Sequence, residues 1–294
     1  MPQIIACIIL AIVPVFVWGY IFYKKNPENK RSILLTFIFG ALAVFPILLY
    51  KLSWQIFPWI NAFKIADFYS EDVIGFTNLI VLPMSVLITF MFVGLIEEIM
   101  KFFSVKIADD DEIESVDDSM EFFIIAALGF SFIENILYFY NILITRGPNH
   151  LFFPFLFRSS FSTLAHIIFS GILGYYYGVA HFAKPILQEE IRKNRRHWTK
   201  AFHKILGVGR NRLFYQENLT EGLLISIGLH AIFNIFLEMN LTFFIVPFLL
   251  SGYLAINYLF DKKESHKNYR KVRAKVRNHP HPKSKIFFLP QKIR

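Results

Sequence analysis

The chain has one cysteine, Cys7, among its 294 residues. A single thiol can form neither an intrachain disulfide nor a cysteine-based metal cluster, so both are excluded within one chain. Charged residues are also scarce, at 18% of the sequence, whereas soluble domains carry about 25%. The sequence has no detectable internal repeat and no polar segment of useful length for a separate soluble domain. These shortages exclude a disulfide scaffold and an ordinary soluble enzyme.

Hydrophobic residues make up 55% of the chain, including 35 phenylalanines, and the mean hydropathy is +0.45. Most of the long apolar runs approach the roughly 20 residues that cross a bilayer as a helix. The sequence therefore predicts an all-α, polytopic membrane helix bundle over 1–260 with about seven transmembrane helices. The predicted spans are 3–22, 33–50, 76–103, 121–144, 161–182, 222–237 and 241–260.

The distribution of basic residues predicts the orientation. If the N-terminus is outside, the inside segments 23–32, 104–120, 183–221 and 261–294 hold 4, 1, 9 and 12 Lys plus Arg. The outside segments hold only Lys51, Lys64, Arg146 and Arg158. The positive-inside rule then predicts an N-out, C-in protein, which agrees with an odd number of spans. We expect the first span to act as a signal anchor, and we place the protein in the cell (plasma) membrane as a multi-pass protein.

The basic residues behind the net charge of +9 are distributed among these loops and do not form one surface. No nucleic-acid partner is therefore predicted. The basic loop 183–212 and the basic tail 261–294, which we expect to be cytoplasmic and flexible, suit anionic lipid headgroups. Seven acidic residues lie between Asp109 and Asp118. No role is assigned to them from the sequence, whereas the simplest interpretation of the basic loop 183–212 is a solvated face that also sets the topology.

Three charges lie inside the third predicted span: Glu97, Glu98 and Lys101. A charge at the centre of a bilayer costs about 2.5–3.5 kcal/mol on insertion scales, so such residues indicate function. The lysine is one helical turn after the carboxylates and can neutralise either of them. The predicted span runs inward under an N-out topology, which places this pair in its inner half.

The next three spans carry polar residues at helical spacing. They are Phe130, Glu134 and Asn135 on the fourth span, Ser162, His166 and Ser170 on the fifth, and Ser226, His230 and Asn234 on the sixth. Because polar groups that face lipid would stay unsatisfied, we expect a shared water-accessible cavity within about 76–240. Ser170, Gly174 and Gly178 are interpreted as a ladder of small residues that allows close helix packing.

This residue set suits hydrolysis by activated water. A buried glutamate beside a second carboxylate can serve as a general base for a water that attacks a carbonyl. Histidine and asparagine can donate hydrogen bonds to the oxyanion that develops. A covalent mechanism is not indicated, since no serine or cysteine lies in a recognisable nucleophile elbow.

Four motifs in this region resemble those of the PrsW-type intramembrane proteases, which are relatives of the CAAX prenyl endopeptidases. Glu-Glu-x-x-Lys matches Glu97 to Lys101, and Phe-x-x-x-Glu-Asn matches Phe130 to Asn135. A third motif centred on His fits His166, and His-x-x-x-Asn matches His230 and Asn234. The prenyl endopeptidases typically have His in place of Glu134. Each motif is weak alone, but the ordered quartet on consecutive spans is specific.

The resemblance implies an intramembrane endopeptidase and assigns a role to each residue. Glu97 is expected to be the general base and Glu98 its partner, with Lys101 balancing charge. Glu134 and His166 are expected to position water or transfer a proton, and His230 and Asn234 to bind the carbonyl oxygen. Phe130 and Asn135 support the site. The implied substrate is a single-pass membrane protein such as an anti-sigma factor, cut on its extracytoplasmic side, or, by the prenyl relatives, a lipidated peptide.

Three questions stay open at this stage. Family members have been labelled metalloproteases, and Zn²⁺ is the alternative cofactor, with Glu97, Glu134, His166 and His230 as its ligands. We favour no metal, because the sequence lacks the His-Glu-x-x-His arrangement that places two imidazoles on one helix face. A proton- or cation-coupled transporter would use the same Glu/His cluster, although no inverted repeat supports it. A lipid-sensing scaffold without catalysis is the third alternative.

Overall fold

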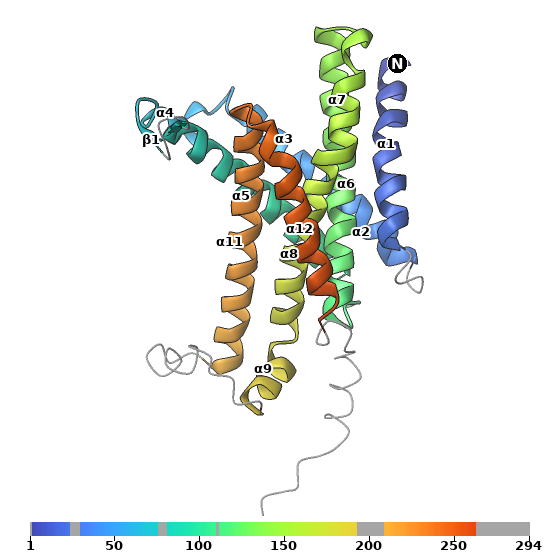
Figure 1. Cartoon of the computed structure of the whole chain (residues 1–294), viewed down its shortest axis with the longest axis vertical. Coiled ribbons are helices and arrows are strands. Elements are labelled where there is room, and N and C mark those ends of the chain that lie inside the picture. Colours follow the sequence, from blue (N-terminus) through green and yellow to red (C-terminus); the bar gives the residue numbers. More distant parts are fainter. Residues whose placement is uncertain (1, 24–29, 76–80, 110–111, 193–208, 263–294) are drawn as a thin grey trace, which may run out of the picture.

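The computed structural model describes residues 2–23, 30–75, 81–109, 112–192 and 209–262, and the described chain is almost entirely helical (Figure 1). The long helices are α1 (Pro2–Tyr23), α2 (Lys30–Leu42), α3 (Val44–Ser53), α5 (Met84–Asp109), α6 (Val116–Thr145), α8 (Thr163–His181), α11 (Arg210–Glu238) and α12 (Ile245–Phe260). The shorter elements are η1 (Pro58–Ile60), α4 (Lys64–Asp67), η2 (Pro148–His150), α7 (Phe152–Phe157), the π-helix η3 (Arg158–Ser162), α9 (Ala183–Arg192) and η4 (Thr242–Phe244). Two three-residue strands, β1 (Val73–Gly75) and β2 (Val81–Pro83), pair antiparallel.

Helices long and apolar enough to cross a membrane confirm the predicted all-α polytopic bundle. Six such stretches occur among the described residues: Pro2–Tyr20, Arg31–Ser53, Val116–Thr145, Pro148–His181, Arg210–Glu238 and Thr242–Phe260. They correspond to six of the seven predicted spans. The remaining one, α5, has 26 residues, which is enough length to cross the hydrocarbon core. It is not among the six apolar helices because it carries Glu97, Glu98 and Lys101. The predicted number of seven transmembrane helices therefore stays a prediction.

The two ends of the bundle differ (Figure 1). The N-terminus of α1 and helix α7 lie at one end, whereas α9 lies at the other. Helix α12 runs from the first end toward the second, as an odd number of crossings requires. The predicted N-out orientation and the lipid contacts of the basic segments stay predictions, because residues 193–208 and 263–294 lie outside the described part of the chain.

Helix α6 is the centre of the packing, in contact with α8, α2, α1 and α5. It begins with a capping box, in which Ser115 Oγ accepts from the Asp118 amide at 3.1 Å and the Asp118 carboxylate accepts from the Ser115 amide at 2.8 Å. One residue of the acidic segment therefore caps the start of a helix. The small-residue ladder is confirmed as a packing surface, because a Cβ on Gly174 would lie 2.8 Å from Met120 Cα of α6.

Helix α5 is displaced along the chain from its predicted range. It begins at Met84, directly after Pro83 ends β2. Proline is compatible with a helix start and disrupts a helix interior, which explains the later beginning. Glu97 and Glu98 are therefore the fourteenth and fifteenth of 26 residues. They lie at the middle of the helix, and their predicted position in the inner half of the span stays a prediction.

Candidate active site

Glu98 is the most heavily hydrogen-bonded side chain of the site. Its Oε1 accepts from Lys101 Nζ at 2.7 Å and lies 2.9 Å from His230 Nδ1. Its Oε2 accepts from Ser226 Oγ at 2.9 Å and from Ser170 Oγ at 3.3 Å. Glu98 and Lys101 are fully buried. Four partners from three helices satisfy this carboxylate, so it has little capacity left for a substrate or a water.

Glu97, in contrast to Glu98, is not saturated by hydrogen-bond partners. Its Oε2 is buried and accepts no hydrogen bond from the described residues. The nearest charged or polar atom given for it is His230 Nε2, at 3.6 Å, which is too long for a direct hydrogen bond. The side chain is 15% exposed. A buried acceptor without a donor is rare in proteins, and it marks the place where a water or substrate atom would bind.

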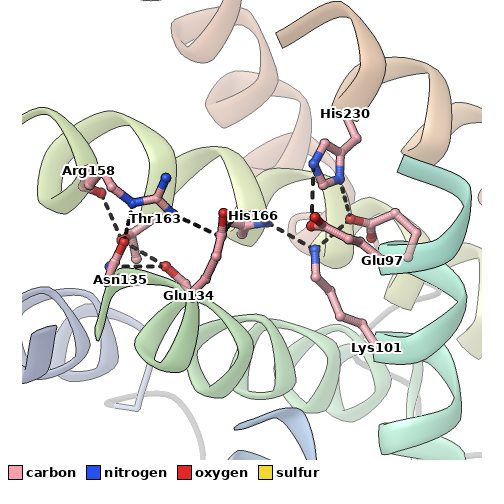
Figure 2. Close-up of polar contacts among 10 residues, drawn as sticks. Glu97, Lys101, Glu134, Asn135, Arg158, Thr163, His166 and His230 are labelled. Atoms are coloured by element: carbon pink, nitrogen blue, oxygen red, sulfur yellow. Dashed lines mark hydrogen bonds and ion pairs between the residues drawn. The ribbon is translucent and has the colours of Figure 1, made fainter. Parts of the chain in front are cut away.

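A hydrogen-bonded chain connects the two halves of the site (Figure 2). Lys101 Nζ lies 3.0 Å from His166 Nδ1, and His166 Nε2 lies 2.9 Å from Glu134 Oε2. An ammonium only donates and an ionised carboxylate only accepts. The His166 ring must then accept at Nδ1 and donate from Nε2. Lys101 thus fixes the tautomer of His166 while it neutralises Glu98.

Arg158 extends the hydrogen-bonded chain beyond Glu134. Its Nη2 forms an ion pair with Glu134 Oε2 at 2.9 Å, and its Nε donates to Asn135 Oδ1 at 2.6 Å. The Asn135 amide lies 3.4 Å from Thr163 Oγ1, which also donates to the Arg158 carbonyl at 2.9 Å. The carbonyl belongs to the π-helix η3, whose next carbonyl, at Ser159, accepts from the Trp18 indole at 3.0 Å. Such π-helical segments frequently occur at functional sites.

Phe130 covers the inner face of this cluster. Its ring centre is 4.6 Å from Lys101 Nζ and 5.7 Å from the centre of the His166 ring. The lysine therefore gains a cation–π contact in addition to its two polar contacts. Phe130 thus contacts two of the predicted site residues, and its supporting role stays a prediction.

The structure brings together all but one of the predicted site residues. Glu97, Glu98 and Lys101 come from α5, Glu134 and Asn135 from α6, His166 from α8 and His230 from α11. Asn234 lies one turn beyond His230, but no hydrogen bond within the described chain joins it to the cluster. Its predicted contact with a carbonyl oxygen therefore stays a prediction.

Two contributions were not predicted. Arg158 was counted only as an outside charge, although it lies between Phe-rich segments, and the energetic argument applied to Glu97 would have indicated it. Ser170 was placed on the polar stripe of its span and in the ladder of small residues, but its hydrogen bond to Glu98 was not predicted. Hydroxyl donors at a close helix contact have no distinctive sequence pattern.

Three residues of the cluster fit a divalent metal ion. Ligand atoms of Glu97, His166 and His230 lie within 4.8 Å of one another. Carboxylate oxygen and imidazole nitrogen are ordinary Zn²⁺ ligands, and Glu97 offers an oxygen without a donor. Metal-bound histidines usually hold a carboxylate on the other ring nitrogen, as His230 does with Glu98. Glu134, which we included among the alternative ligands, is not in this group.

One feature of the site opposes a metal ion. Both ring nitrogens of His166 already have partners, since Lys101 Nζ lies at Nδ1 and Glu134 at Nε2. An ion bound through His166 would therefore have to displace one of them. Lys101 is the poorer neighbour, because its positive charge repels a cation.

The chain matches a known protein family over most of its length. The model of the PrsW family, described as an intramembrane metalloprotease family, matches residues 28–259 of this chain. The chain is similar to a protein named Protease PrsW of Oceanobacillus iheyensis, with 27% identity over 255 residues that cover 85% of this chain and 91% of that protein. It is also similar to a Protease PrsW of Geobacillus kaustophilus, with 28% identity over 167 residues.

The Geobacillus match covers 55% of this chain and 61% of that relative's length. No solved structure matches the chain. All four motifs, from Glu97 to Asn234, lie inside the region that the family model matches. The matches confirm the resemblance that the ordered motifs indicated.

Proposed function

The chain belongs to the PrsW family of intramembrane proteases, and on that premise we propose that it hydrolyses a peptide bond of a membrane protein with water activated by Glu97. The observation that carries this proposal is the contrast between two adjacent carboxylates. Glu98 is saturated by four partners, whereas Glu97 Oε2 is buried without a donor. A general base needs an acceptor atom that is free to take a proton.

The proposed reaction uses one water molecule and one peptide bond. Glu97 accepts a proton from the water as the water oxygen bonds to the carbonyl carbon. The same proton then passes to the peptide nitrogen, the carbon–nitrogen bond breaks, and Glu97 returns to its carboxylate form. The products are a carboxylic acid and an amine, so atoms and protons balance.

His230 is the proposed partner of Glu97 in this step. Its Nδ1 is anchored on Glu98, which leaves Nε2 3.6 Å from Glu97 Oε2. A water between these two atoms could hydrogen-bond to both of them. Protonated His230 would donate from Nε2 to the oxyanion, where a fixed donor contributes most. Asn234 is the second proposed donor, one turn further along α11.

A divalent ion is the alternative way to activate the water. Glu97, His166 and His230 would hold it, and it would supply a Lewis acid to polarise the carbonyl. We favour the glutamate mechanism, because the Lys101 ammonium already lies at Nδ1 of His166. An ion held by His166 would have to displace Lys101 or Glu134 from its ring, whereas the glutamate mechanism leaves both in place.

The proposed substrate is a single-pass membrane protein of the anti-sigma type, and the proposed location is the plasma membrane. Processing of a lipidated peptide is the alternative suggested by the prenyl relatives. The basic loop 183–212 and the basic tail 261–294 would contact anionic lipid headgroups.

Comparative proteomics of cells with the wild-type protein and with Glu97→Gln tests the proposal. We expect a membrane protein whose shortened form is present only with the wild type, and the new terminus maps the cleavage site. Identical membrane proteomes would contradict proteolysis. Proton-coupled uptake by vesicles with the wild-type protein, lost in Glu97→Gln, would instead support the transporter alternative.

A further inference from the structure

A groove of about 750 Å³ lies beside the catalytic cluster. Its walls come from three parts of the chain: Tyr138 on α6, Leu237 on α11, and the segment of α7 and η3 that includes Arg158, Ser160 and Ser162. Most of the other lining residues are aromatic or aliphatic side chains of α7 and η3. Arg158 is the one charged residue among them.

The groove lies on one definite side of the site. Tyr138 follows Glu134 by four residues, Leu237 follows His230 by seven, and Ser162 precedes His166 by four. At 1.5 Å per residue, these offsets correspond to about 6–10 Å along the helices. Helices α6 and α11 run toward the end of the bundle that carries α7, and α8 runs away from it (Figure 1). All three offsets therefore point toward the same end, and the groove is the approach to the site from there.

Arg158 stands where the groove meets the cluster. It pairs with Glu134 on one side, and its guanidinium lies 4.6 Å from the ring centre of Tyr138 on the other. The Glu134 side chain is 32% exposed although it lies well within α6, so the cluster is reached from this side. Among the described residues, the hydrogen bond given for the Arg158 guanidinium is the one from Nε to Asn135, and Nη2 has only its ion pair with Glu134.

We propose that this groove binds the apolar residues next to the scissile bond of the substrate, and that Arg158 donates to a substrate backbone carbonyl. The proposal rests on the proposed proteolytic function. A peptide that is unwound for cleavage exposes backbone carbonyls, which are unfavourable in a bilayer unless a donor satisfies them. The aromatic walls would hold its side chains while the Arg158 guanidinium satisfies its backbone. An acyl chain would also fill the walls, but it has no acceptor for Arg158.

Filling the groove tests the proposal. The probe is a synthetic transmembrane peptide that spans the cleavage site mapped by proteomics, with the full-length protein in liposomes. Ser160→Trp places a bulky ring in the groove from an exposed position, and Ser251→Trp makes the same change at an exposed position of α12 outside it. We expect Ser160→Trp to lower kcat/KM about tenfold or more, chiefly through KM, as loss of apolar pocket contacts does. Ser251→Trp should leave kcat/KM unchanged.

Enlarging the groove gives a second test. It measures a change in substrate preference, which a folding defect would not produce. Phe153 lines the groove and is 79% exposed, so Phe153→Ala opens space without a core cavity. We expect the preference for Trp over Leu in the flanking peptide positions to rise by about tenfold. An unchanged preference, together with equal rates for the two Trp variants, would overturn the groove proposal alone and favour a lipid occupant. Absence of cleavage by the wild type would overturn the proposed function as well.

Discussion

Lys101 Nζ lies 2.7 Å from Glu98 Oε1, and both side chains are fully buried. This ion pair gives the two adjacent glutamates of α5 different roles. Glu98 holds the lysine, and through it the orientation of His166, whereas Glu97 keeps an oxygen without a donor. The structural and catalytic roles should therefore separate when the two glutamates are changed one at a time.

The first prediction concerns Glu98. Glu98→Gln leaves the Lys101 ammonium buried without its anion, and breaking a buried pair in this way costs about 3–5 kcal/mol. Unfolding can be followed by thiol-dye labelling of Cys7, the single cysteine, which is fully buried. We expect labelling at a clearly lower temperature for Glu98→Gln, while Glu97→Gln labels like the wild type. Equal transitions for both variants would contradict the division of roles.

The second prediction uses the other member of the pair. Lys101→Met leaves Glu98 as a buried, uncompensated carboxylate and should destabilise the protein by a similar 3–5 kcal/mol, approximately. The double variant Glu98→Gln, Lys101→Met removes both charges and should regain most of that stability, although it stays inactive. If the two losses simply add in the double variant, the side chains are not coupled.

The third prediction concerns Arg158. Its contacts with Glu134 and Asn135 predict that Arg158→Met lowers kcat about a hundredfold, because small displacements of catalytic groups are costly. Arg158→Lys keeps the charge but loses the forked geometry, so it should recover only part of the rate. Arg146→Met, at an exposed position after α6, is the control and should be neutral. Full activity of Arg158→Met would exclude a role in positioning Glu134.

The fourth prediction separates the two mechanisms of water activation. If Glu97 acts without a metal, purified protein should retain its cleavage rate after treatment with a zinc chelator, and elemental analysis should find less than one equivalent of metal. Loss of activity that added Zn²⁺ restores would instead assign Glu97, His166 and His230 as ligands. Lys101→Met should then bind the ion more tightly, because the competing ammonium is gone.

Much of this site was predictable because charged side chains are energetically costly in a membrane. Glu97, Glu98, Lys101 and Glu134 stand out in apolar runs, and the helical spacing of His166 and His230 predicted that their helices meet. The same spacing could not show which glutamate is free, because that depends on Ser170 and Ser226, which approach Glu98 from two other helices.

The range of the third span was the weakest part of the prediction. Hydropathy placed the third span at 76–103, whereas the helix runs from Met84 to Asp109. The apolar run begins before the helix does, because β1, β2 and Pro83 precede α5. The result is that Glu97 and Glu98 lie at the middle of α5.

The most direct test of the central claim is the cleavage rate of purified Glu97→Gln in liposomes, measured on the mapped transmembrane peptide. Glutamine keeps the size of the side chain but cannot accept the proton from water. We expect the rate to fall by at least about 10²–10⁴-fold, with Cys7 labelling on heating unchanged from the wild type. Cleavage within about threefold of the wild-type rate, a difference well below the general-base range, would contradict Glu97 as the base.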